Sequence, residues 1–228
     1  MSGETVSASK AILSNLTLWD TYGKLVGLNR TPTEIRRELK SLRSWGAYLL
    51  YLGMDDDAET PLVSSHILAL SDWQDGQSYN PENSQLFFAP SPSWDAGAPS
   101  GKRAVTVHAF TDVDQWFTFH KDHTELEEKD QRMLESCWQQ LHSAMPELGS
   151  RIEVIDTATP RSFYDQTRRK LGMVGGVSPT PDRFWPNRPN YLTSVPNLYI
   201  ISDTTYPGGI AGLTQSAYNL ANQLIRTK

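Results

Sequence analysis

The residue pattern best suited to chemistry lies near the C-terminus, where a predicted buried strand ends and a predicted helix begins. The strand ends at Asp203, whose carboxylate could accept hydrogen bonds from the hydroxyl groups of a ligand. Gly208 and Gly209 follow in a turn, where the lack of a side chain lets backbone approach a ligand closely. Unpaired N–H groups at the helix start, including Ile210 and Ala211, attract a negatively charged or electron-rich group. The same pattern also fits a simple strand–turn–helix corner in which Asp203 is a turn or cap residue.

The other clusters of reactive residues give weaker evidence for a functional site. His120, Asp122 and His123 supply at most three ligands, whereas a structural metal needs about four. The acidic run 55–57 could hold a divalent cation, but such runs are usually solvated turns. Cys137 falls on the apolar side of a predicted helix, which favours a buried, inert thiol over a nucleophile. We therefore predict no metal site, and the catalytic residues stay unassigned.

Composition and charge exclude several classes of protein. The 228 residues include 21 Lys and Arg and 26 Asp and Glu, for a net charge of −5, so the chain lacks the basic face that nucleic acid requires. The single cysteine excludes an intramolecular disulfide and any multi-cysteine metal cluster. No apolar run has the length of a membrane span, and the N-terminal residues lack the features of a signal peptide. We expect a cytoplasmic globular protein.

Periodicity in the first half of the chain predicts one helix followed by an antiparallel sheet. Thr31, Pro32 and Glu34 have the spacing of a capping box, so a helix is expected from Thr31 to near Gly46. Short apolar runs separated by turn-rich segments, without long helices between them, then indicate antiparallel strands. These expected strands are residues 47–52, 66–70, 85–89 and 104–110.

The second half adds helices and two further strands, which makes the predicted fold class α+β. The expected elements are a long helix capped by Thr124, a strand at 151–155, a short helix opened by Thr159, a strand at 197–201 and a final helix. The segment 172–189 holds three Gly and four Pro and is predicted to be a loop.

Residues 196–217 resemble the C-terminal flavin-binding signature of the carotenoid (phytoene-type) desaturase and isomerase group, within the FAD-dependent amine oxidase superfamily. That signature consists of a strand, an Asp, a Pro-Gly turn, an Ile or Val followed by Ala, and a helix containing Ser. The similarity continues along the whole chain in order. Its other parts are residues 11–15, 49–55, the strand at His66, the Pro-rich loop 91–99, residues 102–110, Thr159 with Pro160, and the Gly-rich stretch 172–176.

The resemblance implies the substrate domain of an FAD-dependent oxidoreductase, with an antiparallel β-sheet, flanking helices and the C-terminal strand and helix of the FAD domain. Residues 1–30 would then be a residual FAD-domain strand and connector, residues 31–170 the substrate-binding domain, and residues 171–228 the C-terminal FAD-domain segment. The apolar sheet would form the wall of a cavity for a polyene substrate.

The resemblance also implies a set of FAD-binding residues. Asp203 would lie near the ribityl–phosphate chain, and the helix start at Gly209, Ile210 and Ala211 would face the pyrimidine edge of the flavin ring. Gly208, in the preceding turn, and Gly175, in the Gly-rich stretch near the ring, complete the expected set.

The sequence departs from the family pattern in ways that bear on its partners. Ser202 stands where the family usually has Gly, and the turn after Pro207 is a residue shorter. The Gly-x-Gly-x-x-Gly fingerprint that normally holds the FAD pyrophosphate is absent. We therefore expect an incomplete FAD site and a truncated enzyme that needs an N-terminal dinucleotide-binding half. A lipophilic substrate also suggests peripheral contact with a membrane.

Two other interpretations stay open. The chain could be a non-catalytic protein that binds a carotenoid or another apolar ligand, or it could be an inactive fragment. Within the leading interpretation, the sequence does not separate desaturation from isomerisation.

Overall fold

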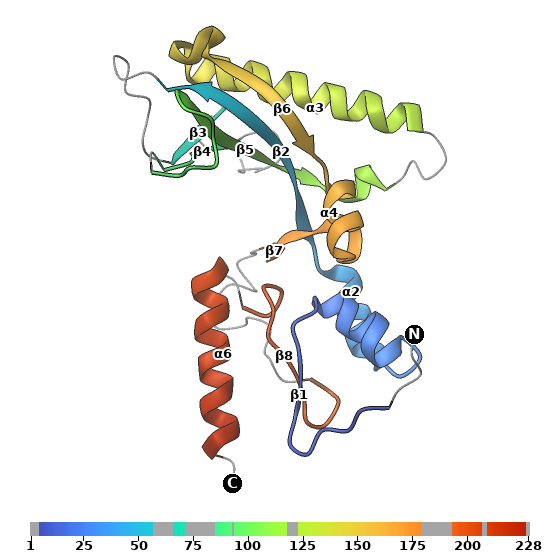
Figure 1. Ribbon diagram of the computed structural model, residues 1–228. Coiled ribbons are helices and arrows are strands. Elements are labelled where there is room, and N and C mark those ends of the chain that lie inside the picture. Colours follow the sequence, from blue (N-terminus) through green and yellow to red (C-terminus); the bar gives the residue numbers. More distant parts are fainter. Residues whose placement is uncertain are drawn as a thin grey trace, which may run out of the picture. The chain divides into compact units, whose positions relative to one another are not determined.

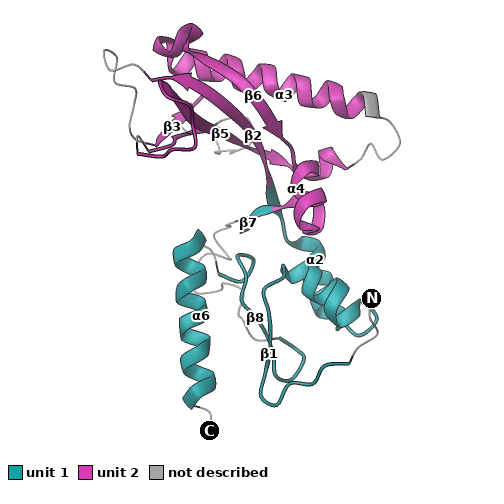
Figure 2. Ribbon diagram, in the orientation of Figure 1, with its two compact units in different colours: residues 1–45, 174–228 teal, residues 46–173 magenta. Residues whose placement is uncertain are grey.

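The computed structural model describes residues 5–56, 66–71, 85–92, 94–117, 123–178, 193–206 and 209–226. The chain divides into two compact units (Figure 2). Unit 1 comprises Met1–Trp45 and Val174–Lys228, and unit 2 is Gly46–Met173. The fold is α+β with an antiparallel sheet, as the sequence predicts.

Unit 2 contains a sheet in the strand order β3-β4-β5-β2-β6 (Figure 1). The pairs β3–β4, β4–β5 and β2–β6 are antiparallel. Its strands are β2 (Ser44–Asp55, from Gly46 onward in this unit), β3 (Ile67–Leu70), β4 (Gln85–Pro90), β5 (Lys102–Asp112) and β6 (Ile152–Ala158). Its helices are α3 (His123–Ala144), α4 (Pro160–Thr167) and short 3₁₀ turns at Asp114–Trp116, Pro146–Arg151 and Lys170–Gly172.

The hydrophobic core of unit 2 lies between one face of the sheet and α3. Alternate residues of β2 and β5 face this core, because successive side chains of a strand point to opposite faces. The buried side chains are Tyr48, Leu50, Leu52 and Met54 of β2, Val105, Val107 and Ala109 of β5, and Cys137 and Leu141 of α3.

A hydrogen bond also joins β2 to α3. The Tyr48 hydroxyl donates to Asp130 Oδ1 at 2.6 Å. Burial, together with this carboxylate, raises the pKa of Tyr48 above its ordinary value, so the phenol stays protonated and remains a donor.

In its described residues, unit 1 contains a parallel pair of short strands and three helical elements. β1 (Ile12–Ser14) pairs in parallel with β8 (Leu198–Ile200). The helices are α1 (Leu18–Asp20), continued by a π-helical segment at Thr21–Gly27, then α2 (Thr33–Ser41) and α6 (Gly209–Arg226). A further strand, β7 (Val174–Val177), pairs with Ser44 and Trp45 at the start of β2.

Three sequence predictions about local structure are wrong. The Thr31 hydroxyl donates to the carbonyl oxygens of Tyr22 and Gly27 instead of capping α2. Consequently α2 begins at Thr33, has no side-chain cap and ends at Ser41, and Gly46 lies in β2. α3 already begins at His123, one residue before the expected cap Thr124.

The third wrong prediction is loop structure at the beginning of the segment 172–189, where residues 174–177 form β7, whereas residues 179–189 lie outside the described part of the chain. Tertiary pairing with β2 overrides the local preference of glycine for turns. By contrast, the helix opened by Thr159 is confirmed, since Thr159 and Ser162 form a complete capping box at the start of α4.

The amphipathic pattern of α6 is only partly reflected in burial. Leu220 is fully buried, whereas Ile210 and Ile225 at the two ends are 86% and 65% exposed. Among the described helices, none combines the length and apolar character required to cross a bilayer.

We predict that Cys137 is chemically silent in the native protein. Burial raises the pKa of this thiol to about 12, so almost no thiolate forms near neutral pH. Ellman's reagent should react slowly with the native chain and rapidly after unfolding in guanidinium, and Cys137 is the only cysteine that can report. Fast labelling of the folded protein would contradict the packing of α3 on the sheet.

Candidate functional site

The turn that follows β8 is held together by buried hydroxyl groups. Ser202, Thr204 and Thr205 are each 3% exposed or less. Ser202 Oγ and Thr204 Oγ1 lie 2.5 Å apart, and Thr204 Oγ1 also accepts a hydrogen bond from the Leu18 N–H at 3.0 Å. Thr205 Oγ1 donates to the Ser202 carbonyl oxygen at 2.9 Å. Because its inner polar atoms are paired, the turn can be buried and is locally well ordered.

Asp203 lies at the border of this turn, and its side chain is half-buried. Its carboxylate oxygen Oδ1 is 3.5 Å from Ser202 Oγ. The Ser202 hydroxyl, which replaces the glycine usual in the family, is thus used inside the turn. Asp203 is thus only partly enclosed by the turn.

The backbone of Asp203 contacts the Gly-rich strand β7. Gly176 has a φ of +84°, and a Cβ at this position would lie 2.2 Å from the Asp203 carbonyl oxygen. The carbonyl oxygen of Gly176 in turn accepts a hydrogen bond from the buried Ser44 hydroxyl. Only glycine permits this close approach of two backbones. The structure therefore brings Gly176, from the Gly-rich stretch expected near the cofactor, into contact with Asp203.

Gly175 differs from its neighbour. It has a φ of +74°, but a Cβ there would meet nothing within 4 Å, and the residue is exposed. The space into which a side chain at position 175 would project therefore holds no described atom of the protein.

The start of α6 is exposed to solvent. Gly209 has a φ of +60° with open space around a notional Cβ, and Gly209, Ile210 and Ala211 are all exposed. The N–H groups of this first turn have no intrahelical partners, so they remain available to an electron-rich ligand atom. Gly208, also expected to bind the cofactor, and Pro207 lie outside the described residues.

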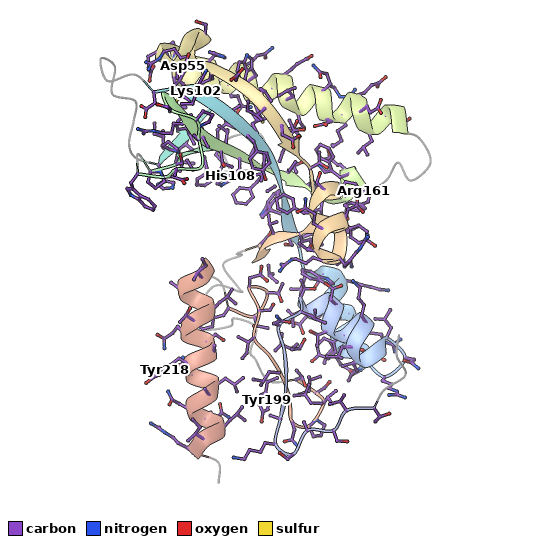
Figure 3. The ribbon with its side chains drawn as sticks, viewed as in Figure 1. Asp55, Lys102, His108, Arg161, Tyr199 and Tyr218 are labelled. Carbon is purple, nitrogen blue, oxygen red and sulfur yellow. The ribbon has the colours of Figure 1, made fainter. Side chains whose placement is uncertain are left out.

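A second candidate region lies on the sheet of unit 2, on the face opposite α3. Phe87 of β4 is directly opposite His108 of β5, and their rings stack at a centroid distance of 4.5 Å with 9° between planes. Phe110, two residues along β5, lies edge-on to both rings, at 6.0 Å from Phe87 and 6.4 Å from His108. Figure 3 shows His108 projecting from this side of the sheet. We call Phe87, His108 and Phe110 the aromatic group.

Sequence reasoning did not single out the aromatic group, although the signal was present. In β5, residues 103, 105, 107, 109 and 111 are buried and the alternate residues are not, so His108 and Phe110 share the face away from the core. Strand alternation would have found this face. Only the register between β4 and β5 could add Phe87 to it.

Charged groups lie at one end of the same face. Lys102 Nζ is 2.5 Å from Asp55 Oδ1 and 3.9 Å from Glu153 Oε1 (Figure 3). The hydrogen bond to Asp55 is the main cause of the raised pKa of Lys102. His108, in contrast, has a pKa below its ordinary value because burial disfavours the charged imidazole. The aromatic group is therefore uncharged at neutral pH.

Most of the residues considered as metal ligands lie outside the described part of the chain. His120, Asp122 and Asp57 lie outside the described residues, as does the side chain of His123. Within the described ranges, no group of three or more His, Cys, Asp or Glu side chains could hold a metal ion. Asp55 and Asp56 instead form ion pairs with Lys102 and Arg103.

Comparison with known proteins gives consistent relatives along almost the whole chain. The chain is 24% identical over 221 residues to the chloroplastic prolycopene isomerase of Daucus carota, which covers 95% of this chain and 35% of the relative. The corresponding protein of Arabidopsis thaliana is also 24% identical over 221 residues, with 95% and 36% covered. Prolycopene isomerase 2 of an Oncidium hybrid cultivar is 23% identical over 220 residues, with 95% and 37% covered. No protein-family model matches the sequence.

A solved structure supports the same type of fold. The chain is similar to an oxidoreductase from Methanosarcina mazei, with a TM-score of 0.53 and 15% identity over 93% of this chain and 42% of that chain. The resemblance to the carotenoid isomerase group of the FAD-dependent amine oxidase superfamily is thus confirmed as weak homology. The chain spans about a third of the length of the curated relatives it matches.

We predict that Gly176→Ala is much more destabilising than Gly175→Ala. Both positions have positive φ, so each substitution carries a strain of about 1 kcal/mol, but only the Gly176 variant adds a collision with the Asp203 carbonyl. We expect Gly176→Ala to cost about 3 kcal/mol or more in free energy of unfolding, on the scale of severe single substitutions. Urea unfolding followed by circular dichroism would measure both; equal losses would contradict the contact between β7 and Asp203.

Proposed function

We propose that this chain is the substrate-domain portion of an FAD-dependent oxidoreductase of the carotenoid isomerase or desaturase type. The observation that carries the proposal is the similarity to prolycopene isomerases over about 220 collinear residues. It includes the corner where Gly176 lies against Asp203. The similar oxidoreductase structure supports the fold of such an enzyme.

The parallel pair β1–β8 supports the assignment of unit 1 to an FAD domain. Parallel strands are normally part of larger sheets covered on both faces, and an isolated two-stranded sheet is at best marginally stable. Ile12 and Leu13 of β1 are 51% and 55% exposed. These exposed apolar side chains fit a surface that a dinucleotide-binding half would cover, whether that half is carried by the same polypeptide or by another one.

The residues around the corner fit part of an FAD site. The exposed N–H groups at Gly209, Ile210 and Ala211 can stabilise negative charge on a ring edge, and the half-buried Asp203 carboxylate can accept hydrogen bonds from ribityl hydroxyls. The open positions at Gly175 and Gly209 leave room for a ligand against the backbone. When bound, FAD would supply the redox chemistry. Since the sequence lacks the pyrophosphate fingerprint, most of the binding energy must come from the other half.

The substrate in this proposal is a conjugated polyene, the class to which the prolycopene of the named relatives belongs. The face of the sheet opposite α3 would orient the polyene and exclude water, and its aromatic group supports that role. Whether the reaction is a desaturation or an isomerisation is not distinguished by these residues. We also propose that such a lipophilic substrate reaches the protein through transient contact with a membrane. The cytoplasmic location stays a prediction, and the named relatives are chloroplastic.

The partly buried aromatic group also favours a second candidate function, the binding of a carotenoid or another apolar ligand without redox chemistry. This function would need neither FAD nor a dinucleotide-binding half. An inactive fragment, in contrast, would bind neither FAD nor a polyene.

We predict that co-expression with a dinucleotide-binding polypeptide that carries the missing Gly-x-Gly-x-x-Gly half yields a yellow complex that contains FAD. Gel filtration with absorbance in the flavin band would detect it, and this chain expressed alone serves as the control. A colourless mixture in which the two polypeptides elute separately would reject the oxidoreductase proposal.

In that complex, Asp203→Ala should lower FAD occupancy. Loss of a charged hydrogen bond to a ligand hydroxyl costs about 1.5–3 kcal/mol, or roughly ten-fold or more in affinity. Asp203→Asn separates loss of charge from loss of the side chain, and Asp165→Ala removes an exposed carboxylate of α4 as a matched control. Flavin fluorescence released by denaturation gives the occupancy. Unchanged occupancy in Asp203→Ala would show that the cofactor is placed wrongly.

A further inference from the structure

The sheet of unit 2 has an apolar face on the side opposite α3 (Figure 1). On this face Leu68 and Leu70 of β3 are each 49% exposed and Tyr51 of β2 is 39% exposed. Leu68 is directly opposite Phe87, which in turn is opposite His108, so the side chains form a row across the strands. Across β3, β4 and β5 this row is about 10 Å wide, from two strand spacings of about 4.8 Å.

The aromatic group gives the middle of this row a defined shape. The nearly parallel rings of Phe87 and His108 form a stacked pair, and Phe110 stands almost perpendicular to them. Aromatic rings held by adjacent strands lose little freedom when a further flat group contacts them, because their positions are already set by the sheet. The row therefore suits a planar, conjugated ligand better than a flexible chain.

The distribution of charge on this face favours an uncharged ligand at its centre. No residue of β3 or β4, as described, carries a charge. The charged side chains that share the face belong to the ends of β5 and to the neighbouring strands: Lys102 and Asp112 of β5, Asp55 of β2, and Glu153 and Asp156 of β6. Lys102 is paired with Asp55 and Glu153. His108 is the titratable residue of the aromatic group itself.

We propose that His108 is a specificity-determining residue that holds the conjugated part of an apolar polyene on the aromatic group while its imidazole is neutral, and releases it when the imidazole is protonated. This proposal rests on the proposed function for the class of ligand. It goes beyond that function by naming the residue that contacts the polyene and the charge state that contact requires.

The sign of the pH effect follows from desolvation. Burial already lowers the pKa of His108, and a bound hydrocarbon would remove more water from the ring and oppose protonation further. Affinity is therefore constant above the lowered pKa and falls as the pH drops through it. Protonation of His108 and binding of the polyene exclude one another.

The test uses the full chain and lycopene dispersed in detergent micelles, with quenching of tryptophan fluorescence as the binding signal. We expect His108→Ala to weaken binding roughly five-fold at neutral pH through loss of the ring contact. His108→Phe should keep the affinity of the unmodified chain at neutral pH. His142→Ala is the matched control, because His142 also contacts an aromatic ring, Trp138 at 4.7 Å, but belongs to α3.

The pH profile separates a binding role from a structural one. The affinity of the unmodified chain should stay constant through the ordinary titration range of histidine and then fall by roughly ten-fold for each pH unit below the lowered pKa of His108, and His108→Phe should show no such fall. This comparison decides the matter even if His108→Ala fails to fold. Any of three results would overturn the proposal. The unmodified chain does not bind lycopene, folded His108→Ala binds it with unchanged affinity, or His108→Phe keeps the pH dependence.

The outcomes separate this proposal from the proposed function. Binding that depends on His108, without any flavin in the complex with the dinucleotide-binding polypeptide, supports the role of His108 and rejects the oxidoreductase. A flavin-loaded complex whose lycopene affinity ignores His108 supports the oxidoreductase and rejects the role of His108.

Discussion

Burial of one face of a sheet against a single long helix is the constraint on which the organisation of unit 2 depends. Side chains of β2 and β5 alternate, so filling the core with residues such as Leu50 and Val107 sends their neighbours to the opposite side. Those neighbours include His108 and Tyr51. The hydrophobic core of unit 2 therefore forms on one face of the sheet, and the opposite face carries the partly buried aromatic group.

Unit 1 follows a different logic, because it depends on contacts between backbones more than on a large core. Gly176 lies against the Asp203 carbonyl, and hydroxyl groups of Ser202 and Thr204 satisfy the turn from within. Such an arrangement fixes the path of the chain at a strand end without filling the space beside it. That is the usual setting of a ligand site in α/β folds, where helix starts and strand ends offer unpaired backbone groups.

The two regions divide the work that the proposed function requires. The corner in unit 1 has the donors and the carboxylate expected of a flavin contact, and the open face in unit 2 has the apolar, uncharged surface expected of a polyene contact. Weak homology to prolycopene isomerases joins both regions in one ancestry. A capped turn would account for the corner alone, and a half-buried sheet would account for the aromatic group alone. The proposal is stronger because both regions lie within the single stretch of sequence that is similar to the prolycopene isomerases.

The amino-acid sequence by itself determined the α+β class, most of the strands, the buried Cys137 and the strand–turn–helix corner at Asp203. These features follow from periodicity and from local turn chemistry, which act over a few residues. The tertiary structure alone decided that Thr31 bonds to Tyr22 and Gly27 instead of capping a helix, that the Gly-rich segment forms β7, and that Phe87 stacks on His108. β7 and the stacking of Phe87 on His108 depend on pairing with another strand and on its register. The Thr31 bonds depend on how the backbone folds between residues 22 and 31, which the capping pattern at Thr31 does not encode.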